Sequence, residues 1–364
     1  MHRKTRFVCV SDTHGYTPSE AGFKLPAGDV LIHAGDLTNK GSMSELRRTM
    51  DWISNADFEI KIIVAGNHDV SLDSEIYAQH GRAFHGPRLE DPQQCIETIT
   101  RHAPSVVLLR HQAAVIRLTR ANGPRTAFKV FGSPHLGLWI RNVRRRGALE
   151  PDPPDADLIV THTPPRSHCD KKPDGTSVGC DALRQTLSRI RPPLAICGHV
   201  HEGRGYERVG WRGSVIETGC CAPADVDADR VMKGTLPPRE SKKINLIDLT
   251  GKRGDRLDNR GFACGNADAV LQTRAVSKTE AAPLPLPEVE SAAGTVPDQG
   301  YRENGLATPT PSADIHIGGH LLSLRKETCI INAAVMATSW PHRGGKLFNA
   351  PIVVDIELPV HHEV

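Results

Sequence analysis

A set of side chains suited to metal-ion chemistry stands in short polar clusters between residues 12 and 201. They are imidazoles, carboxylates and one amide: Asp12, His14, Asp36, Asn67, His68, His162, His199 and His201. Such a mixture of nitrogen and oxygen donors suits borderline first-row divalent metals. Two cations about 3.5–4 Å apart can share a water, lower its pKa and hold the attacking and leaving oxygens of a phosphoryl group. The pattern therefore predicts a two-metal site for phosphoryl chemistry.

Each of these residues also has an ordinary structural interpretation when taken alone. Asp12 is a common turn former, and Asn67 follows Gly66 as turn residues often do. His162 before Thr-Pro-Pro could be a hydrogen-bonded loop histidine, and the His199–His201 pair could lie in a solvated loop. Their joint occurrence favours a site, because every cluster comes directly after the same kind of apolar run.

The elements that must position these residues are short runs rich in Val, Ile and Leu. The runs are Phe7–Val10, Val30–His33, Ile60–Ala65, Leu158–Val160 and Leu194–Cys197. Continuous apolar runs of this length are typical of strands buried on both faces. Each run ends in one of the polar clusters, so the clusters occupy the carboxyl ends of the predicted strands.

Helical patterns lie between the predicted strands. Ser42-x-x-Glu45 is a capping-box pattern, with Leu46, Met50 and Ile53 at helical spacing behind it. A second helix is predicted over Asp181–Ile190, where Pro192 follows its end. Strands that alternate with helices predict an α/β fold, in which ligand sites gather beyond the carboxyl ends of the strands.

The sequence changes character after about residue 222. Periodicity mostly fails between Ala222 and Lys326, and Ala281–Pro311 is rich in Pro, Gly and Thr, which predicts a flexible segment. Ile244–Leu249 is an exception and predicts a strand or a docked peptide. Strand patterns return at Thr328–Ala334 and Ile352–Leu358. We expect one domain, residues 1–221 and 327–364, interrupted by a largely disordered insertion over residues 222–326.

Charge and composition exclude several classes of protein. The chain has 364 residues, with 45 Lys and Arg against 42 Asp and Glu, a net charge of +3. This balance argues against stable nucleic-acid binding, which usually needs a basic excess. No apolar run approaches the roughly 20 residues of a membrane span, and no secretory signal follows the basic Met1–Arg6. We expect an intracellular, cytoplasmic protein that does not bind membranes.

The cysteines predict neither disulfides nor a structural zinc site. The sequence has 9 cysteines and no Cys-x-x-Cys pair. Several stand inside apolar runs, where a cysteine behaves as a small buried hydrophobic residue. We expect most of them to be free thiols.

The polar clusters match a known series of motifs. The chain resembles the calcineurin-like metallophosphoesterases and, more narrowly, the small metallophosphoesterase-domain-containing proteins and their fungal relatives. The motifs are Asp12-x-His14, Gly35-Asp36, Gly66-Asn67-His68-Asp69, Thr161-His162 and Gly198-His199-x-His201. The narrower resemblance rests on Thr161–Pro165, Gly198–Gly205, Ile331–Ala333 and Pro351–Leu358. It covers about Phe7–Cys221 and Glu327–Val360 and leaves most of the insertion unexplained.

The resemblance implies a four-layer αββα sandwich with a dinuclear metal site between its two sheets. The implied ligands of one metal are Asp12, His14 and His201; those of the other are Asn67, His162 and His199; and Asp36 would bridge the two. The metals would be Mn, Fe or Zn, since these ligands accept all three. His68 would protonate the leaving oxygen as general acid, and Asp69 would orient His68.

These features predict a metal-dependent phosphoric ester hydrolase. We expect a phosphodiesterase that cleaves small nucleotide-like substrates by in-line attack of a metal-bridging hydroxide. Arg204, just beyond His201, and His168, in the loop after Pro165, are the candidate substrate-binding residues.

Two alternatives remain open at this stage. One is a phosphomonoesterase, including a protein serine/threonine phosphatase. The other is a nucleotide-binding scaffold with weak turnover, to which the insertion would bring a protein partner. The full ligand set, His199 included, argues against the scaffold.

Overall fold

The computed structural model describes most of the chain outside the predicted insertion. The described residues are 1–134, 155–211, 229–257, 259, 325–339, 342 and 345–361. They all belong to one compact unit, formed by Met1–Gly261 and Gly318–Val364. The segment Ala281–Pro311, for which the sequence predicts flexibility, lies outside the described residues, as do Cys220, Cys221 and Cys264.

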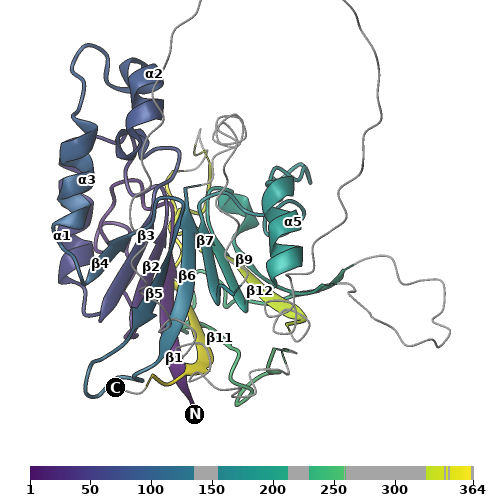
Figure 1. The fold of residues 1–364 in the computed structure, drawn as a ribbon. Coiled ribbons are helices and arrows are strands. Elements are labelled where there is room, and N and C mark those ends of the chain that lie inside the picture. Colours follow the sequence, from purple (N-terminus) through teal and green to yellow (C-terminus); the bar gives the residue numbers. More distant parts are fainter. Residues whose placement is uncertain are drawn as a thin grey trace, which may run out of the picture. The chain divides into compact units, whose positions relative to one another are not determined.

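One sheet has six strands in the order β11-β13-β1-β2-β3-β4 (Figure 1). In that order the strands are Asn245–Asp248, Ile352–Pro359, His2–Val10, Val30–Ala34, Ile60–Val64 and Val106–Leu108. β1 to β4 run parallel, whereas β13 is antiparallel to β1 and parallel to β11. The carboxyl ends of β1, β2 and β3 therefore meet at one edge of this sheet.

The second sheet has seven strands in the order β10-β9-β12-β8-β7-β6-β5. In that order the strands are Arg230–Lys233, Gly205–Gly210, Glu327–Asn332, Leu194–Cys197, Leu158–Thr161, Ala127–Ser133 and Gln112–Arg117. β12, β8, β7 and β6 run parallel, and β9 and β5 pair antiparallel with their neighbours. The carboxyl ends of β7 and β8 again lie at one edge.

The helices flank the two sheets. They are α1 (Met43–Asn55), α2 (Ser74–His85), α3 (Pro92–Thr100) and α5 (Asp181–Ile190), with short 3₁₀ turns η1 (Val70–Leu72) and η2 (His201–Gly203). The predicted capping box is present, because Ser42 accepts from the Glu45 amide while Glu45 bonds back to the Ser42 amide. The predicted second helix is α5, which buries Leu183, Leu187 and Ile190.

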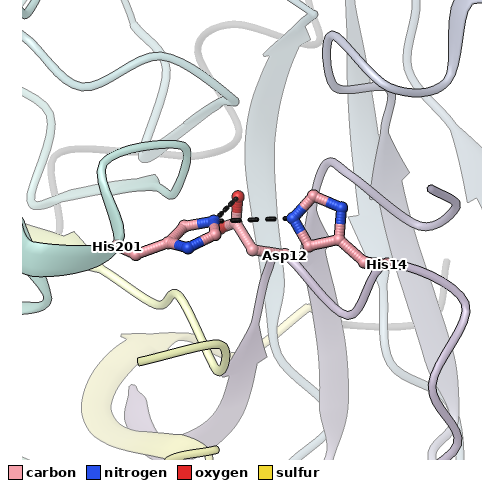
Figure 2. Close-up of side chains that lie close together, drawn as sticks. All are labelled: Asp12, His14 and His201. Carbon is pink, nitrogen blue, oxygen red and sulfur yellow. Dashed lines mark hydrogen bonds and ion pairs between the residues drawn. The ribbon is translucent and has the colours of Figure 1, made fainter. Parts of the chain in front are cut away.

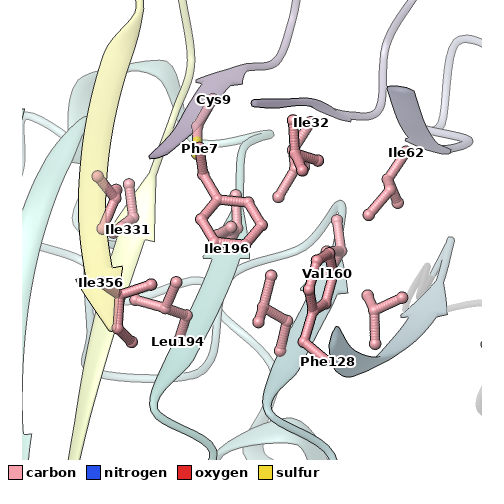
Figure 3. Close-up of a cluster of buried hydrophobic side chains, with 14 of the residues drawn as sticks. Phe7, Cys9, Ile32, Ile62, Phe128, Val160, Leu194, Ile196, Ile331 and Ile356 are labelled. Atoms are coloured by element: carbon pink, nitrogen blue, oxygen red, sulfur yellow. The ribbon is translucent and has the colours of Figure 1, made fainter. Parts of the chain in front are cut away.

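The main core lies between the two sheets. Phe7, Ile32, Val160, Ile196 and Ile331 meet there from five different strands (Figure 3). Strand residues alternate between faces, so Val8 and Val10 of β1 pack on the other side, against α1 and α3. A third cluster joins α5 to the seven-stranded sheet. These layers confirm the predicted four-layer αββα fold and the predicted burial of strands on both faces.

Two strands fall within the stretch for which the sequence predicts a largely disordered insertion. β11 extends the six-stranded sheet beside β13, at the position where Ile244–Leu249 predicts a strand. β10 pairs with β9 at the edge of the seven-stranded sheet, and no sequence pattern had predicted this strand. The boundaries of the insertion stay a prediction, because most of it lies outside the described residues.

Membrane and disulfide features are absent from the part of the chain that the structure describes. None of its helices is both long and apolar enough to cross a membrane. Its cysteines form no disulfide, and Cys9, Cys197 and Cys329 are buried in strands. For these cysteines the structure agrees with the predicted free thiols.

Candidate metal centre

Every polar cluster predicted to hold metal lies just beyond a strand end. Asp12 and His14 follow β1, Asp36 follows β2, and Asn67 and His68 follow β3; His162 follows β7, and His199 and His201 follow β8. Among the described residues, three sets of side chains bring ligand atoms within 4.8 Å of one another: Asp12, His14 and His201; His14, Asp36 and His68; and Asp12, Asp36 and His162. Both sheets contribute ligand atoms, so the centre depends on their packing.

Asp12, His14 and His201 point toward one another (Figure 2). His201 Nε2 lies 3.4 Å from Asp12 Oδ1 and 3.5 Å from His14 Nε2. The other nitrogen of His201, Nδ1, lies 2.9 Å from the Thr338 carbonyl oxygen. A carbonyl partner on one ring nitrogen fixes the tautomer and aims the other nitrogen at a metal. These three side chains therefore fit one metal ion.

Asp36 lies between this set and a second one. Its Oδ2 is 3.7 Å from His14 Nε2, and its Oδ1 is 3.4 Å from His162 Nε2. His162 Nε2 is also 3.0 Å from Asn67 Oδ1, while its Nδ1 lies 2.9 Å from the Ala34 carbonyl oxygen. One carboxylate thus faces two imidazoles from opposite sets, which is the arrangement that a bridging ligand requires.

His199 lies next to His162, on the side of β8. Its ring lies edge-on to that of His162, with the centroids 5.0 Å apart. Its backbone amide donates to both carboxylate oxygens of Asp12, at 3.1 and 3.0 Å. This bond ties the β8 loop to the end of β1, on the opposite sheet.

Several of the predicted ligands have unusual backbone conformations. Asp12, His14, Asp36 and His199 have φ values of 57°, 45°, 53° and 69°. Residues other than glycine rarely adopt positive φ, at a cost of roughly 1 kcal/mol or more each. Such strain gathers at functional sites, where the surrounding structure maintains it. It turns these side chains inward at the strand ends.

Neighbouring glycines leave room for the carboxylates. A Cβ at Gly66 would collide with the amide and carboxylate of Asp36, and one at Gly198 would collide with Ser11 and Asp12. Glycine is required at both positions because the backbone passes directly against a predicted ligand.

Burial and charge divide the histidines into two classes. Burial lowers the pKa of His14 and of His199 to about 4, so both are neutral at pH 7. Burial acts in the same direction on His162 and His201, but the carboxylates of Asp36 and Asp12 outweigh it and raise each pKa to about 9.

The carboxylates are correspondingly ionised. Burial opposes their charge, yet hydrogen bonding and attraction to His201 and His162 lower the pKa of Asp12 to about 2. Attraction to His162 holds the pKa of Asp36 well below its ordinary value. Without metal, the centre therefore holds two protonated imidazoles against two carboxylates, and a cation would replace the protons. Donor types, convergence and charge all fit divalent metal.

His68 lies at the margin of the centre. Its ring is edge-on to His14, with the centroids 4.7 Å apart, and its backbone amide donates to Asp36 Oδ1 at 2.9 Å. Nδ1 of His68 lies 2.7 Å from the Asn39 carbonyl oxygen. A carbonyl therefore orients the ring, where the sequence predicted that Asp69 would do so.

Asp69 has a different role in the structure from the predicted one. Its buried carboxylate accepts from the amides of Gly66, Leu37 and Thr38, and from the Thr38 hydroxyl. The chain turns tightly here, with the Asp69 amide on the Gly66 carbonyl at 3.2 Å, so the carboxylate folds back onto its own turn. Asp69 thus joins the loops that carry Asp36 and Asn67.

His168, a predicted substrate-binding residue, is buried in the fold. It is 2% exposed, its Nδ1 lies 3.0 Å from Glu207 Oε2, and its ring packs edge-on against Trp211. A side chain enclosed in this way has a structural role, which differs from the predicted substrate contact. Because burial depends on tertiary packing, the loop sequence could not reveal it.

Arg204, the other predicted substrate-binding residue, follows η2 directly. Its Nη2 donates to the Ala350 carbonyl at 2.5 Å, and burial lowers its pKa to about 10. It borders a cavity beside the metal centre rather than the centre itself. Whether it contacts substrate stays a prediction.

Several residues that organise the centre gave little sign in the sequence. The carbonyls of Ala34, Asn39 and Thr338 orient His162, His68 and His201. Every residue has a carbonyl, so no residue type marks these positions. Asn332 is different: its buried amide joins the Cys169 and Val200 carbonyls, and its position at the end of β12 could have indicated a site role.

The chain's match to a family of known proteins agrees with this fold and this candidate centre. Residues 5–203 match the family of calcineurin-like phosphoesterases, and the chain belongs to that family. The human metallophosphoesterase domain-containing protein 1 is 34% identical over 229 residues, which cover 59% of this chain and 66% of that protein. A UPF0046 protein of Caenorhabditis elegans is 32% identical over 207 residues, covering 55% of this chain and 64% of that protein.

A fungal relative shares only a small part of its length. A protein of Emericella nidulans named probable rhamnogalacturonate lyase C is 37% identical over 213 residues, which cover 57% of this chain and 18% of that protein. The chain therefore spans less than two thirds of each of these three relatives.

Proposed function

We propose that the protein is a phosphodiesterase that hydrolyses small nucleotide-like phosphoesters with the help of two divalent metal ions. The position of Asp36 carries this proposal: its oxygens lie 3.7 Å from His14 Nε2 and 3.4 Å from His162 Nε2. A carboxylate shared by two sets of ligands is what a dinuclear centre requires. Family membership supports phosphoester hydrolysis in general, and the preference for diesters is our own inference.

The side chains divide between two cations. Asp12, His14 and His201 would hold one cation, Asn67, His162 and His199 the other, and Asp36 both. Bound cations of this kind, Mn, Fe or Zn, lower the pKa of a water and neutralise charge on phosphoryl oxygens. Asn67 contributes no charge, so the centre stays receptive to an anionic substrate.

His68 is placed to move a proton. Because its Nδ1 donates to the Asn39 carbonyl, the proton for the leaving oxygen would come from Nε2 of the doubly protonated ring, which returns to the neutral form that keeps its proton on Nδ1. A general acid in this position contributes about 10²–10⁴-fold to rate. The contribution is largest for poor leaving groups, which depart only when protonated.

The test is turnover of bis-p-nitrophenyl phosphate and of p-nitrophenyl phosphate by protein stripped of metal and refilled with Mn²⁺. We expect the diester to be preferred, activity to need metal, and Asp36→Ala to lose both metal and activity. We expect His68→Ala to keep its metal and to lose about 10²-fold or more on an ester with a poor leaving group. His80→Ala, on the exposed face of α2, is the matched control.

Other outcomes point to specific alternatives. Preference for the monoester would indicate a phosphomonoesterase or protein phosphatase. Metal binding without turnover of either ester would indicate the nucleotide-binding scaffold. Normal turnover of poor leaving groups by His68→Ala would refute the general-acid assignment.

A further inference from the structure

A cavity lies beside the metal centre, where η2 ends and β9 begins. Its volume is about 200 Å³, and charged side chains surround it: Asp170, Lys171, Glu202, Arg204, Glu207 and Lys233. Glu202 and Gly203 belong to the same short turn as the metal-ligating candidate His201. The cavity therefore begins directly next to the centre, although none of the predicted metal ligands lines it.

The carboxylates of this cavity already have partners. Glu202 accepts from the amide and hydroxyl of Ser339, each at 3.1 Å. Glu207 lies 3.0 Å from His168 Nδ1 and 3.7 Å from Lys233 Nζ. Both carboxylates are therefore already engaged, and of their partners only Lys233 lines the cavity.

The cations Arg204 and Lys171 are not matched in this way. Neither forms an ion pair with any described residue, and within the described part of the chain the Arg204 side chain has only the Ala350 carbonyl as a hydrogen-bond partner. Arg204 Nε is buried with no hydrogen-bond partner among the described residues. Burial is also the cause that lowers the pKa of this guanidinium. A buried charge without a counter-charge is costly, and an anion beside it would offset that cost.

Asp170 adds a hydrogen-bond acceptor to these two donors. It is 0% exposed, and its Oδ2 accepts from the amides of Ser167 and Gly179. Its Oδ1 is buried with no partner among the described residues. A carboxylate oxygen accepts hydrogen bonds from hydroxyl groups. The cavity thus offers free donors at Arg204 and Lys171 and a free acceptor at Asp170.

We propose that this cavity binds the part of a nucleotide substrate that carries a second, non-reacting phosphate. The phosphate would receive hydrogen bonds from Arg204 and Lys171, and a sugar hydroxyl would donate to Asp170. Guanidinium and ammonium groups are the usual partners of phosphate, and such charge-assisted bonds are about twice as strong as neutral ones. This inference rests on the proposed function, because the cavity would hold the part of the substrate that extends beyond the phosphate cleaved at the metal centre.

Binding of inorganic phosphate tests the cavity without relying on hydrolysis. The full-length protein, held in chelator so that the metal centre cannot bind the anion, is titrated with phosphate in a calorimeter. We expect one site in the wild type, and Arg204→Met to weaken it about tenfold or more, because a hydrogen bond to a charged group is lost. Lys171→Met should weaken binding less, and the neighbouring Lys172→Met, which does not line the cavity, should match the wild type.

Kinetics on the metal-loaded protein test the link to the substrate. The p-nitrophenyl ester of thymidine 5′-phosphate is compared with the same ester carrying a 3′-phosphate. We expect the wild type to have the lower KM for the phosphorylated ester, Arg204→Met to abolish that difference and Lys171→Met to reduce it, whereas Lys172→Met keeps it.

The two measurements separate the failures. The cavity assignment would be overturned if the wild type bound no phosphate. It would also be overturned if Arg204→Met and Lys171→Met bound phosphate as tightly as the wild type, even if both esters were hydrolysed. Phosphate binding that responds to these variants, with no ester hydrolysed, would leave the phosphate site standing and would refute the proposed enzyme. If Arg204→Met does not fold, Lys171→Met, a change at an exposed residue, decides the question.

Discussion

Asn332 provides the sharpest test of how the second sheet positions its metal ligands. Its side chain is 0% exposed at the end of β12. Nδ2 donates to the carbonyls of Cys169 at 3.0 Å and Val200 at 2.8 Å, and Oδ1 accepts from the Ala334 amide at 3.1 Å. Val200 stands between His199 and His201. We predict that Asn332→Ala loses both stability and metal affinity.

The magnitude follows from which groups lose their partners. The Val200 carbonyl keeps a bond from the Gly203 amide at 3.0 Å. The Cys169 carbonyl and the Ala334 amide have no other partner among the described hydrogen bonds. Two buried groups left unsatisfied cost about 1–3 kcal/mol each, so the free energy of unfolding should fall by about 2–6 kcal/mol. Because the turn that carries His201 loses its anchor, metal affinity should fall by about tenfold or more.

Urea denaturation and competition with a chelator measure the two effects. Asn245→Ala is the matched control: Asn245 is also buried and its Nδ2 also donates to two carbonyls, those of Ala350 and Pro351. It lies on the edge strand β11, away from the predicted ligands, so it should lose stability and keep its metal affinity. If Asn332→Ala bound metal as tightly as Asn245→Ala, the positioning argument would be refuted.

Two further predictions concern protons and space at the centre. The pKa values of about 9 for His162 and His201 lie above the value of about 6.5 for histidine in the unfolded chain. Protonation of these two side chains therefore stabilises the folded, metal-free protein fully below pH 6.5. This stabilisation is lost as the pH rises through 9. Because metal binding needs neutral imidazoles, log affinity should rise by up to about two units per pH unit between pH 6.5 and 9, as measured by chelator competition. A slope near zero would show that these histidines are already neutral. Gly198→Ala should lose most of its metal, as measured by elemental analysis, because the new methyl group would overlap Ser11 and Asp12. Gly22→Ala, where a Cβ meets nothing within 4 Å although φ is +71°, should keep its metal; equal metal content in the two variants would contradict the steric argument.

The sequence alone marked the residues that the fold brings together at the candidate centre, and their order along the chain. Apolar runs followed by Asp, Asn or His identified the ends of β1, β2, β3, β7 and β8. Buried strands need continuous apolar residues, and their polar ends cannot enter the core, so composition is enough to place these boundaries. The four-layer fold followed from the resemblance, and the observed layers agree with it.

Tertiary structure alone decided how the side chains around those ligands are used. Asp69 follows His68 in the sequence, yet the turn directs its carboxylate to the amides of Leu37 and Thr38. His168 is a loop residue by sequence and is buried against Glu207 and Trp211 in the fold. The direction of a side chain and its burial depend on neighbours distant in sequence. Every residue has a backbone carbonyl, so residue type does not reveal which carbonyl orients a ligand. The sequence therefore identifies the candidate ligands. The hydrogen-bond partners that orient each ligand come into place only when the two sheets pack together.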